Sequence, residues 1–219
     1  MRVAALLAAA LAAGAAFARP PAKPQPGYQC RYERQGDFGE ISADFEIPRE
    51  GTATIPPFLR WETVGAPLLA PQISAAFYRS EDGRFRIENG YATISWHVWD
   101  PKRRPLTLSL QLRSRPEAPR FGQAALAGGF EQSGGPFHLN VDWSDVVSFA
   151  RGARELHLVA IDRKRRVVAA TPVDGTIFER AEPHILAALG EVEAIIANPA
   201  AACDYLEDLR SNDIILTGG

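Results

Sequence analysis

Apolar and polar residues alternate with a period of two through much of the first half of the chain. In residues 40–47 every second residue is apolar, and in residues 106–113 four leucines alternate with polar side chains. This alternation is typical of antiparallel strands that have one face on a core and the other in water. Turn-forming sequences occur at 80–83 and 88–90. Further strands are predicted at 28–32, 58–64, 73–78 and 91–99.

The second half of the chain mixes strands with helices. Residues 137–141 alternate again and predict a strand. Asp142 follows directly and is a typical residue for capping a helix N-terminus. Gly152 is a suitable end for the short helix that this pattern predicts.

Two consecutive segments, 156–161 and 167–171, are apolar on both faces and predict a hairpin that is covered on both sides. The expected cover is a C-terminal helix that begins at Pro183 and carries an apolar stripe. A last strand is expected at 214–216. Together the elements predict an α+β fold, mainly antiparallel β (a sandwich-like or strongly bent sheet), with helices in the C-terminal third.

The N-terminus has the pattern of a secretory signal peptide. Arg2 precedes an apolar run rich in alanine and leucine, which ends in Ala16-Phe17-Ala18. Signal peptidase accepts this spacing of small residues, so we expect removal of residues 1–18 and a periplasmic or secreted mature protein. The apolar run is shorter than the ~20 residues of a membrane span. No later segment is long enough either, so we expect no transmembrane segment in the mature chain.

The remaining residues are expected to form a tether and one domain. Residues 19–27 are proline-rich, which is typical of an extended linker. Residues 28–219 are enough for a single globular domain with a full core. Residues 114–120 contain two prolines and could join two subdomains.

The chain has two cysteines, Cys30 and Cys203, one near each end of the expected domain. An exported protein folds under oxidising conditions, so we expect these cysteines to form a disulfide bond rather than two buried thiols. The chain has no Cys-x-x-Cys sequence, so a redox-active dithiol is not indicated.

The basic residues are clustered although the net charge is only −2. Such a balance argues against nucleic acid as a partner. The clusters at 100–104 and 162–166 resemble each other, and each is expected at the exposed tip of a hairpin. Solvated turns are one interpretation. The other is a single surface for an anionic partner, with a tryptophan that could stack on a sugar. The binding residues would then be Trp99, Lys102, Arg103, Arg104, Lys164, Arg165 and Arg166.

The histidines allow both a functional and a structural interpretation. His138, Asn140 and Asp142 share the polar face of one strand, which fits either a metal site or general base, or simply a water-facing surface. His157 lies between apolar neighbours and is expected to be a hydrogen-bonded core histidine. His184 is expected at the surface.

No common catalytic, nucleotide-binding or metal-binding motif occurs in the chain. We therefore expect an exported, bacterial cell-envelope protein with a non-catalytic binding or accessory role toward an anionic or glycan partner. Neither a cofactor nor a metal ion is expected. One alternative is a periplasmic hydrolase of unknown substrate that uses His138 or His97 with a nearby carboxylate. Another is an inhibitor-like protein-interaction domain whose hairpins insert into a partner enzyme.

Overall fold

The computed structural model describes residues 25–49, 58–64, 70–98, 107–117, 125–127, 132–133, 136–153 and 155–209. The expected signal peptide, most of the expected tether and the expected strand at 214–216 lie outside the described residues. The first described strand begins at Gln25, within the range expected for the tether.

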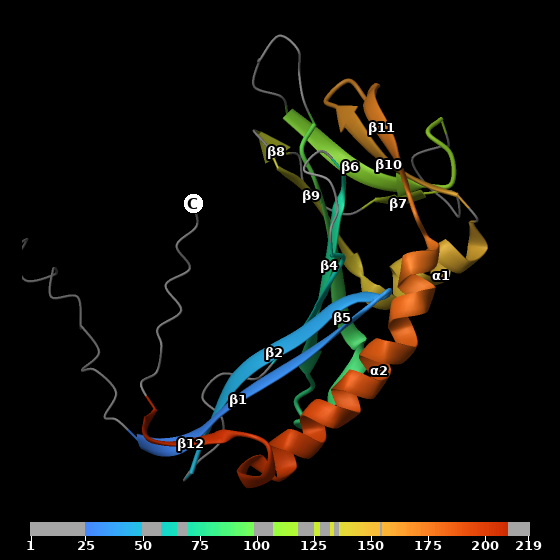
Figure 1. Ribbon diagram of the computed structural model, residues 1–219. Helices are drawn as coiled ribbons and strands as arrows, with labels where there is room; N and C mark the ends of the chain where they lie inside the picture. Colours follow the sequence, from blue (N-terminus) through green and yellow to red (C-terminus); the bar gives the residue numbers. More distant parts are fainter. Residues whose placement is uncertain are drawn as a thin grey trace, which may run out of the picture.

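The described strands form two antiparallel sheets (Figure 1). The first sheet has seven strands in the order β12-β1-β2-β3-β4-β5-β9. They are β1 (Gln25–Gly36), β2 (Gly39–Pro48), β3 (Phe58–Glu62), β4 (Gln72–Arg79), β5 (Phe85–Trp96), β9 (Phe137–Asp142) and β12 (Asp204–Leu209).

The second sheet has five strands in the order β11-β10-β6-β7, with β8 paired to β6. They are β6 (Thr107–Arg113), β7 (Ala125–Ala127), β8 (Gln132–Ser133), β10 (Leu156–Asp162) and β11 (Val167–Val173). In Figure 1 this sheet lies at one end of the first. The sandwich-like, mainly antiparallel arrangement confirms the predicted fold class.

Two α-helices, α1 (Trp143–Gly152) and α2 (Thr176–Ala197), cover one face of the first sheet, which we call the inner face. Figure 1 shows α2 running along this sheet, where it packs against β2, β3 and β5. A short 3-10 helix, η1 (Pro199–Ala201), follows. The buried rings of Trp61, Phe77, Trp143 and Phe178 meet here, with centroids 5.2 to 6.2 Å apart. This aromatic cluster is the part of the core that joins helices to sheet.

The opposite face of the first sheet, which we call the outer face, is polar. Alternation puts Ile41 and Phe45 of β2 on the inner face and their neighbours Ser42 and Asp44 on the outer face. The strand registers extend this outer face across six strands in two adjacent rows. The first row is Glu33, Ser42, Arg60, Ala76, Tyr91 and Asp142. The second row is Gln35, Glu40, Glu62, Ser74, Thr93 and Asn140.

The prediction that the C-terminal helix begins at Pro183 is wrong, because α2 begins at Thr176. The Asp174 carboxylate accepts hydrogen bonds from the Thr176 N–H at 3.0 Å and from its hydroxyl at 2.6 Å. These bonds satisfy a free donor in the first turn. Pro183 therefore lies inside the helix, where it has no N–H to donate to a preceding carbonyl.

The predicted hairpin of β10 and β11 forms, but it is not covered on both sides. Leu158 and Val159 of β10 point to opposite faces and are both fully buried. In contrast, Val167 and Val168 of β11 are each 46% exposed. The reason is that β11 is an edge strand of the second sheet, whereas α2, the expected cover, packs on the first sheet.

Of the two turns predicted in the first half, one forms. The turn at 80–83 closes with a hydrogen bond from the Gly83 N–H to the Ser80 carbonyl at 2.8 Å. The turn predicted at 88–90 is wrong, since these residues lie inside β5. Gly90 is opposite Phe77 at an irregularity in the strand pairing, and a Cβ there would lie 2.4 Å from the Phe77 ring. Glycine is thus needed at this position for close packing rather than for a turn.

The predicted disulfide bond between Cys30 and Cys203 is confirmed, with an S–S distance of 2.06 Å. Cys30 lies on β1, and Cys203 lies between η1 and β12. Immediately after the bridge, β12 pairs with β1. The bond therefore fastens the end of the described chain to its beginning.

Candidate functional site

The turn between β10 and β11, Asp162 to Arg166, is a compact basic turn. The Arg165 N–H donates to the Asp162 carbonyl at 2.8 Å, and Arg165 adopts a positive φ of 62°. The Asp162 carboxylate accepts the Arg166 N–H at 2.9 Å and its Nε at 2.8 Å. These bonds, the backbone bond first, hold the pKa of the Asp162 carboxyl below its usual range. Arg166 is thus engaged within the turn.

Two other cations of the turn point to solvent. Lys164 and Arg165 are exposed and form no side-chain ion pair within the described part of the chain. A left-handed backbone is uncommon for any residue except glycine, asparagine and aspartate. Arg165 nevertheless occupies such a position. The turn therefore presents two free cationic side chains on a backbone fixed by Asp162.

The strands that flank the first basic run do not pair as the expected hairpin. The strand before the run, β5, belongs to the first sheet, and the strand after it, β6, belongs to the second. The error arose because two alternating segments with a turn-like sequence between them look like a hairpin whether or not they pair. Trp99, Lys102, Arg103 and Arg104 themselves lie outside the described residues.

The register of the second sheet shows where this connection ends. Strand β6 is antiparallel to β10, with Leu108 opposite Asp162. Thr107, the first residue of β6, therefore lies beside the point at which β10 passes into the basic turn. The described chain therefore resumes, after the first basic run, next to the second basic run.

His138 and Asn140 on β9 are both engaged by hydroxyl groups of the neighbouring strand β5. The Ser95 hydroxyl lies 2.8 Å from His138 Nδ1, and the Thr93 hydroxyl donates to Asn140 Oδ1 at 2.8 Å. His97 is exposed. His138 and Asn140 thus belong to the outer face, which contains one serine–histidine pair at Ser95 and His138.

The two remaining histidines differ from expectation in detail. His157 is half-buried, and its buried Nδ1 has no hydrogen-bond partner, so the expected hydrogen-bonded core histidine is not seen. His184 is half-buried in α2, where its ring stacks on Phe38 with centroids 4.0 Å apart. The His184 ring thus contributes to the packing of α2 against Phe38.

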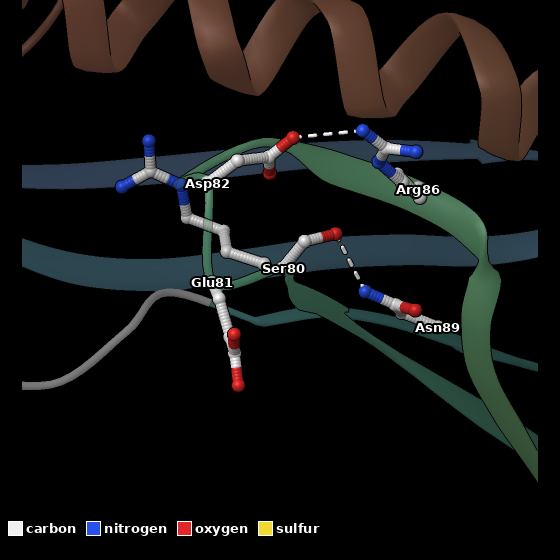
Figure 2. A pocket seen from close by; sticks show the side chains of 6 residues that line it. Ser80, Glu81, Asp82, Arg86 and Asn89 are labelled. Carbon is white, nitrogen blue, oxygen red and sulfur yellow. Dashed lines mark hydrogen bonds and ion pairs between the residues drawn. The ribbon is translucent and has the colours of Figure 1, made fainter.

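Figure 2 shows an open hollow beside the turn between β4 and β5. Asp82 and Arg86 form an ion pair at 2.7 Å, and Asn89 donates to the Ser80 hydroxyl at 2.7 Å. Arg79 packs over the Phe85 ring at 6.0 Å, and its buried Nε has no partner. The lining residues are Arg79, Ser80, Glu81, Asp82, Arg86 and Asn89. Two guanidinium groups face two carboxylates, so the hollow has no charge excess that would select an anion.

Sequence reasoning missed a cluster of exposed rings on the outer face. Phe58, Tyr78 and Tyr91 come from three adjacent strands, β3, β4 and β5. They are 41%, 43% and 54% exposed, and we call them the aromatic patch. The available signal was an aromatic residue at a position that alternation assigns to water, but only strand pairing brings the three together.

Among the described residues, no three His, Cys, Asp or Glu side chains are grouped so as to hold a metal ion. None of the described helices combines the length and apolar character needed to cross a membrane.

The chain was compared with protein families, curated proteins and solved structures, and no match was found in any of the three.

Proposed function

We propose that this chain is a non-catalytic binding protein of the cell envelope that recognises a phosphate-bearing partner through the basic end of its second sheet. The observation that carries the proposal is the register of β6 with β10. It puts Thr107, the first described residue after the run containing Lys102, Arg103 and Arg104, beside the turn containing Lys164 and Arg165.

The chemistry of the turn supports an anionic ligand. Lys164 and Arg165 are exposed, and the one carboxylate within the turn, Asp162, is already bonded to Arg166. Lysine and arginine are the usual phosphate-binding side chains. The disulfide bond supports a location outside the reducing cytosol. Envelope lipids and phosphorylated polysaccharides offer the same phosphate chemistry.

The test is binding of the purified protein to two phosphate probes. The first probe is vesicles of phosphatidylglycerol mixed with phosphatidylcholine, and the second is soluble inorganic polyphosphate. Vesicles of phosphatidylcholine alone are the reference for the first probe. The variant Lys164→Ser/Arg165→Asn removes both free cations, and asparagine tolerates the positive φ at 165. Each cation near an anionic membrane contributes about 1 kcal/mol, so the variant should bind the anionic vesicles about 30-fold more weakly.

A matched control separates a site from net charge. The variant Arg31→Ser/Arg49→Ser removes two exposed cations, one on β1 and one directly after β2, and changes the charge equally. It should retain wild-type affinity. Competition by polyphosphate would identify phosphate itself, rather than the membrane surface, as the recognised group. The proposal is wrong if the wild type binds neither probe, or if both double variants lose binding alike.

One observation favours a second candidate, the hydrolase. Ser95 and His138 are a hydroxyl and an imidazole within hydrogen-bond distance, which is the pairing of an activated serine nucleophile. A fluorophosphonate probe should then label the wild type but not Ser95→Ala. Equal labelling of both proteins, or an unlabelled wild type that turns over no ester, would eliminate this candidate.

A further inference from the structure

The aromatic patch stands out on the outer face because the rest of that face is largely polar. Phe58 and Tyr78 are directly opposite each other on β3 and β4, with ring centroids 5.9 Å apart. Tyr91 on β5 extends the cluster, with its ring centroid 6.4 Å from that of Tyr78. Tyr78 thus links the other two rings, and all three rings, each more than two-fifths exposed, form an apolar surface across β3, β4 and β5.

The core does not explain this exposure. The inner face of the same strands buries Leu59, Trp61 and Phe77 beneath the helices. Contiguous exposed apolar patches rimmed by polar residues are typical of binding surfaces. Cross-strand aromatic pairs also stabilise a sheet, so a test must measure binding and stability separately.

The charges around the patch restrict the ligand. On the outer face of the first sheet, over β1, β2, β3, β4, β5 and β9, carboxylates outnumber guanidinium groups. The carboxylates are Glu33, Glu40, Asp44, Glu46, Glu62 and Asp142, and the guanidinium groups are Arg31 and Arg60. Each guanidinium is paired with a carboxylate, Arg31 with Glu33 at 3.0 Å and Arg60 with Glu62 at 2.5 Å. This surface would repel a polyanion and also a second copy of itself.

The neutral groups next to the patch suit hydroxyl-rich ligands. Ser74, Thr93 and Asn140 form part of the row adjacent to Tyr91. Thr93 donates to the Asn140 Oδ1, so the amide of this exposed asparagine keeps its N–H groups for a ligand. A pyranose ring has an apolar C–H face for stacking on an aromatic ring and hydroxyl groups for such partners.

We propose that the aromatic patch of the outer face is a binding site for a neutral oligosaccharide. The rings of Phe58, Tyr78 and Tyr91 stack on sugar faces, and Asn140 hydrogen-bonds to sugar hydroxyl groups. This site is separate from the basic end of the second sheet and does not depend on the function proposed for it.

The experiment titrates the full folded protein with cello-, chito- and malto-oligosaccharides, with acidic oligosaccharides beside them. Saturation-transfer NMR reports contact between aromatic rings and sugar C–H groups, and calorimetry gives the affinity. Loss of one stacking ring in Tyr91→Ser should weaken binding about tenfold. Tyr91→Phe keeps the ring and should bind within about twofold of the wild type.

The matched control is Tyr205→Ser, which removes another exposed tyrosine, 41% exposed, from β12, where it contacts Tyr28 instead. This variant should bind sugar as the wild type does, and urea denaturation of each variant checks that binding is compared between folded proteins. Anionic vesicle binding should be unchanged in Tyr91→Ser, which keeps the two sites distinguishable. The proposal is overturned if no neutral oligosaccharide binds the wild type, if Tyr91→Ser binds as well as the wild type, or if the patch captures a basic protein and no sugar.

Discussion

Removal of the Cys30–Cys203 disulfide should cost a large part of the free energy of unfolding. The two cysteines are 173 positions apart in the sequence, so the bond closes almost the whole described chain into one loop. In the chain-entropy model, releasing a loop of this length from the unfolded state lowers the free energy of unfolding by about 5 kcal/mol. Most domains have a total of only about 5–15 kcal/mol.

The variant Cys30→Ala/Cys203→Ala and the reduced wild type both lack the cross-link, by two different routes, but only the reduced wild type keeps the two sulfur atoms. The free energy of unfolding of each protein is measured by urea denaturation, with the fluorescence of the buried Trp61 and Trp143 as the signal. At a denaturant slope of about 2.5 kcal/mol per molar urea, the midpoint should fall by about 2 M.

Agreement between the two routes would show that the loss comes from the cross-link rather than from side-chain packing. A decrease of less than about 1 kcal/mol by either route would refute the reasoning. It would mean that the pairing of β12 with β1 already holds the chain ends together in the unfolded ensemble.

Three further predictions concern single positions. Gly39→Ala should destabilise by more than about 2 kcal/mol in thermal unfolding, because φ is +107° and a Cβ would lie 2.4 Å from the Glu62 carbonyl oxygen. Gly190→Ala should instead stabilise by about 0.5–1 kcal/mol in the same assay, because nothing lies within 4 Å and the residue is inside α2. Burial, followed by the hydrogen bond to Glu191, raises the pKa of Tyr32 from 10.0 to about 12. The contribution of this raised pKa to the free energy of unfolding is complete below pH 10 and should be lost as the pH rises toward 12. Denaturation measured as a function of pH should show this loss in the wild type but not in Tyr32→Phe.

Much of the local structure could be predicted from the chain alone. Alternation over 40–47 identifies both a strand and its buried face, because successive side chains of a strand point to opposite sides. With only Cys30 and Cys203 in the sequence, one intramolecular disulfide was available, and it forms. The helix boundary at Pro183 was wrong because a residue that suits a first turn was given more weight than the acceptor at Asp174.

The candidate sites depended on pairing that no local pattern contains. The sequence predicts that the segments of β5 and β6 form a hairpin, yet they belong to different sheets. Strand β6 pairs with β10 instead, and Thr107 therefore lies beside the turn that follows Asp162. Similarly, nothing in the sequence near Phe58 indicates that it will face Tyr78.

The sequence by itself determined where strands could form, which of their faces could be buried, and that one covalent bond could join the chain ends. These properties follow from side-chain alternation and chemistry within a few residues. Only the tertiary structure decided which strands pair, which face the helices cover, and therefore which cations and rings gather at the surface. Strand partners are selected by the burial of the whole core, a free energy that belongs to residues far apart in the chain.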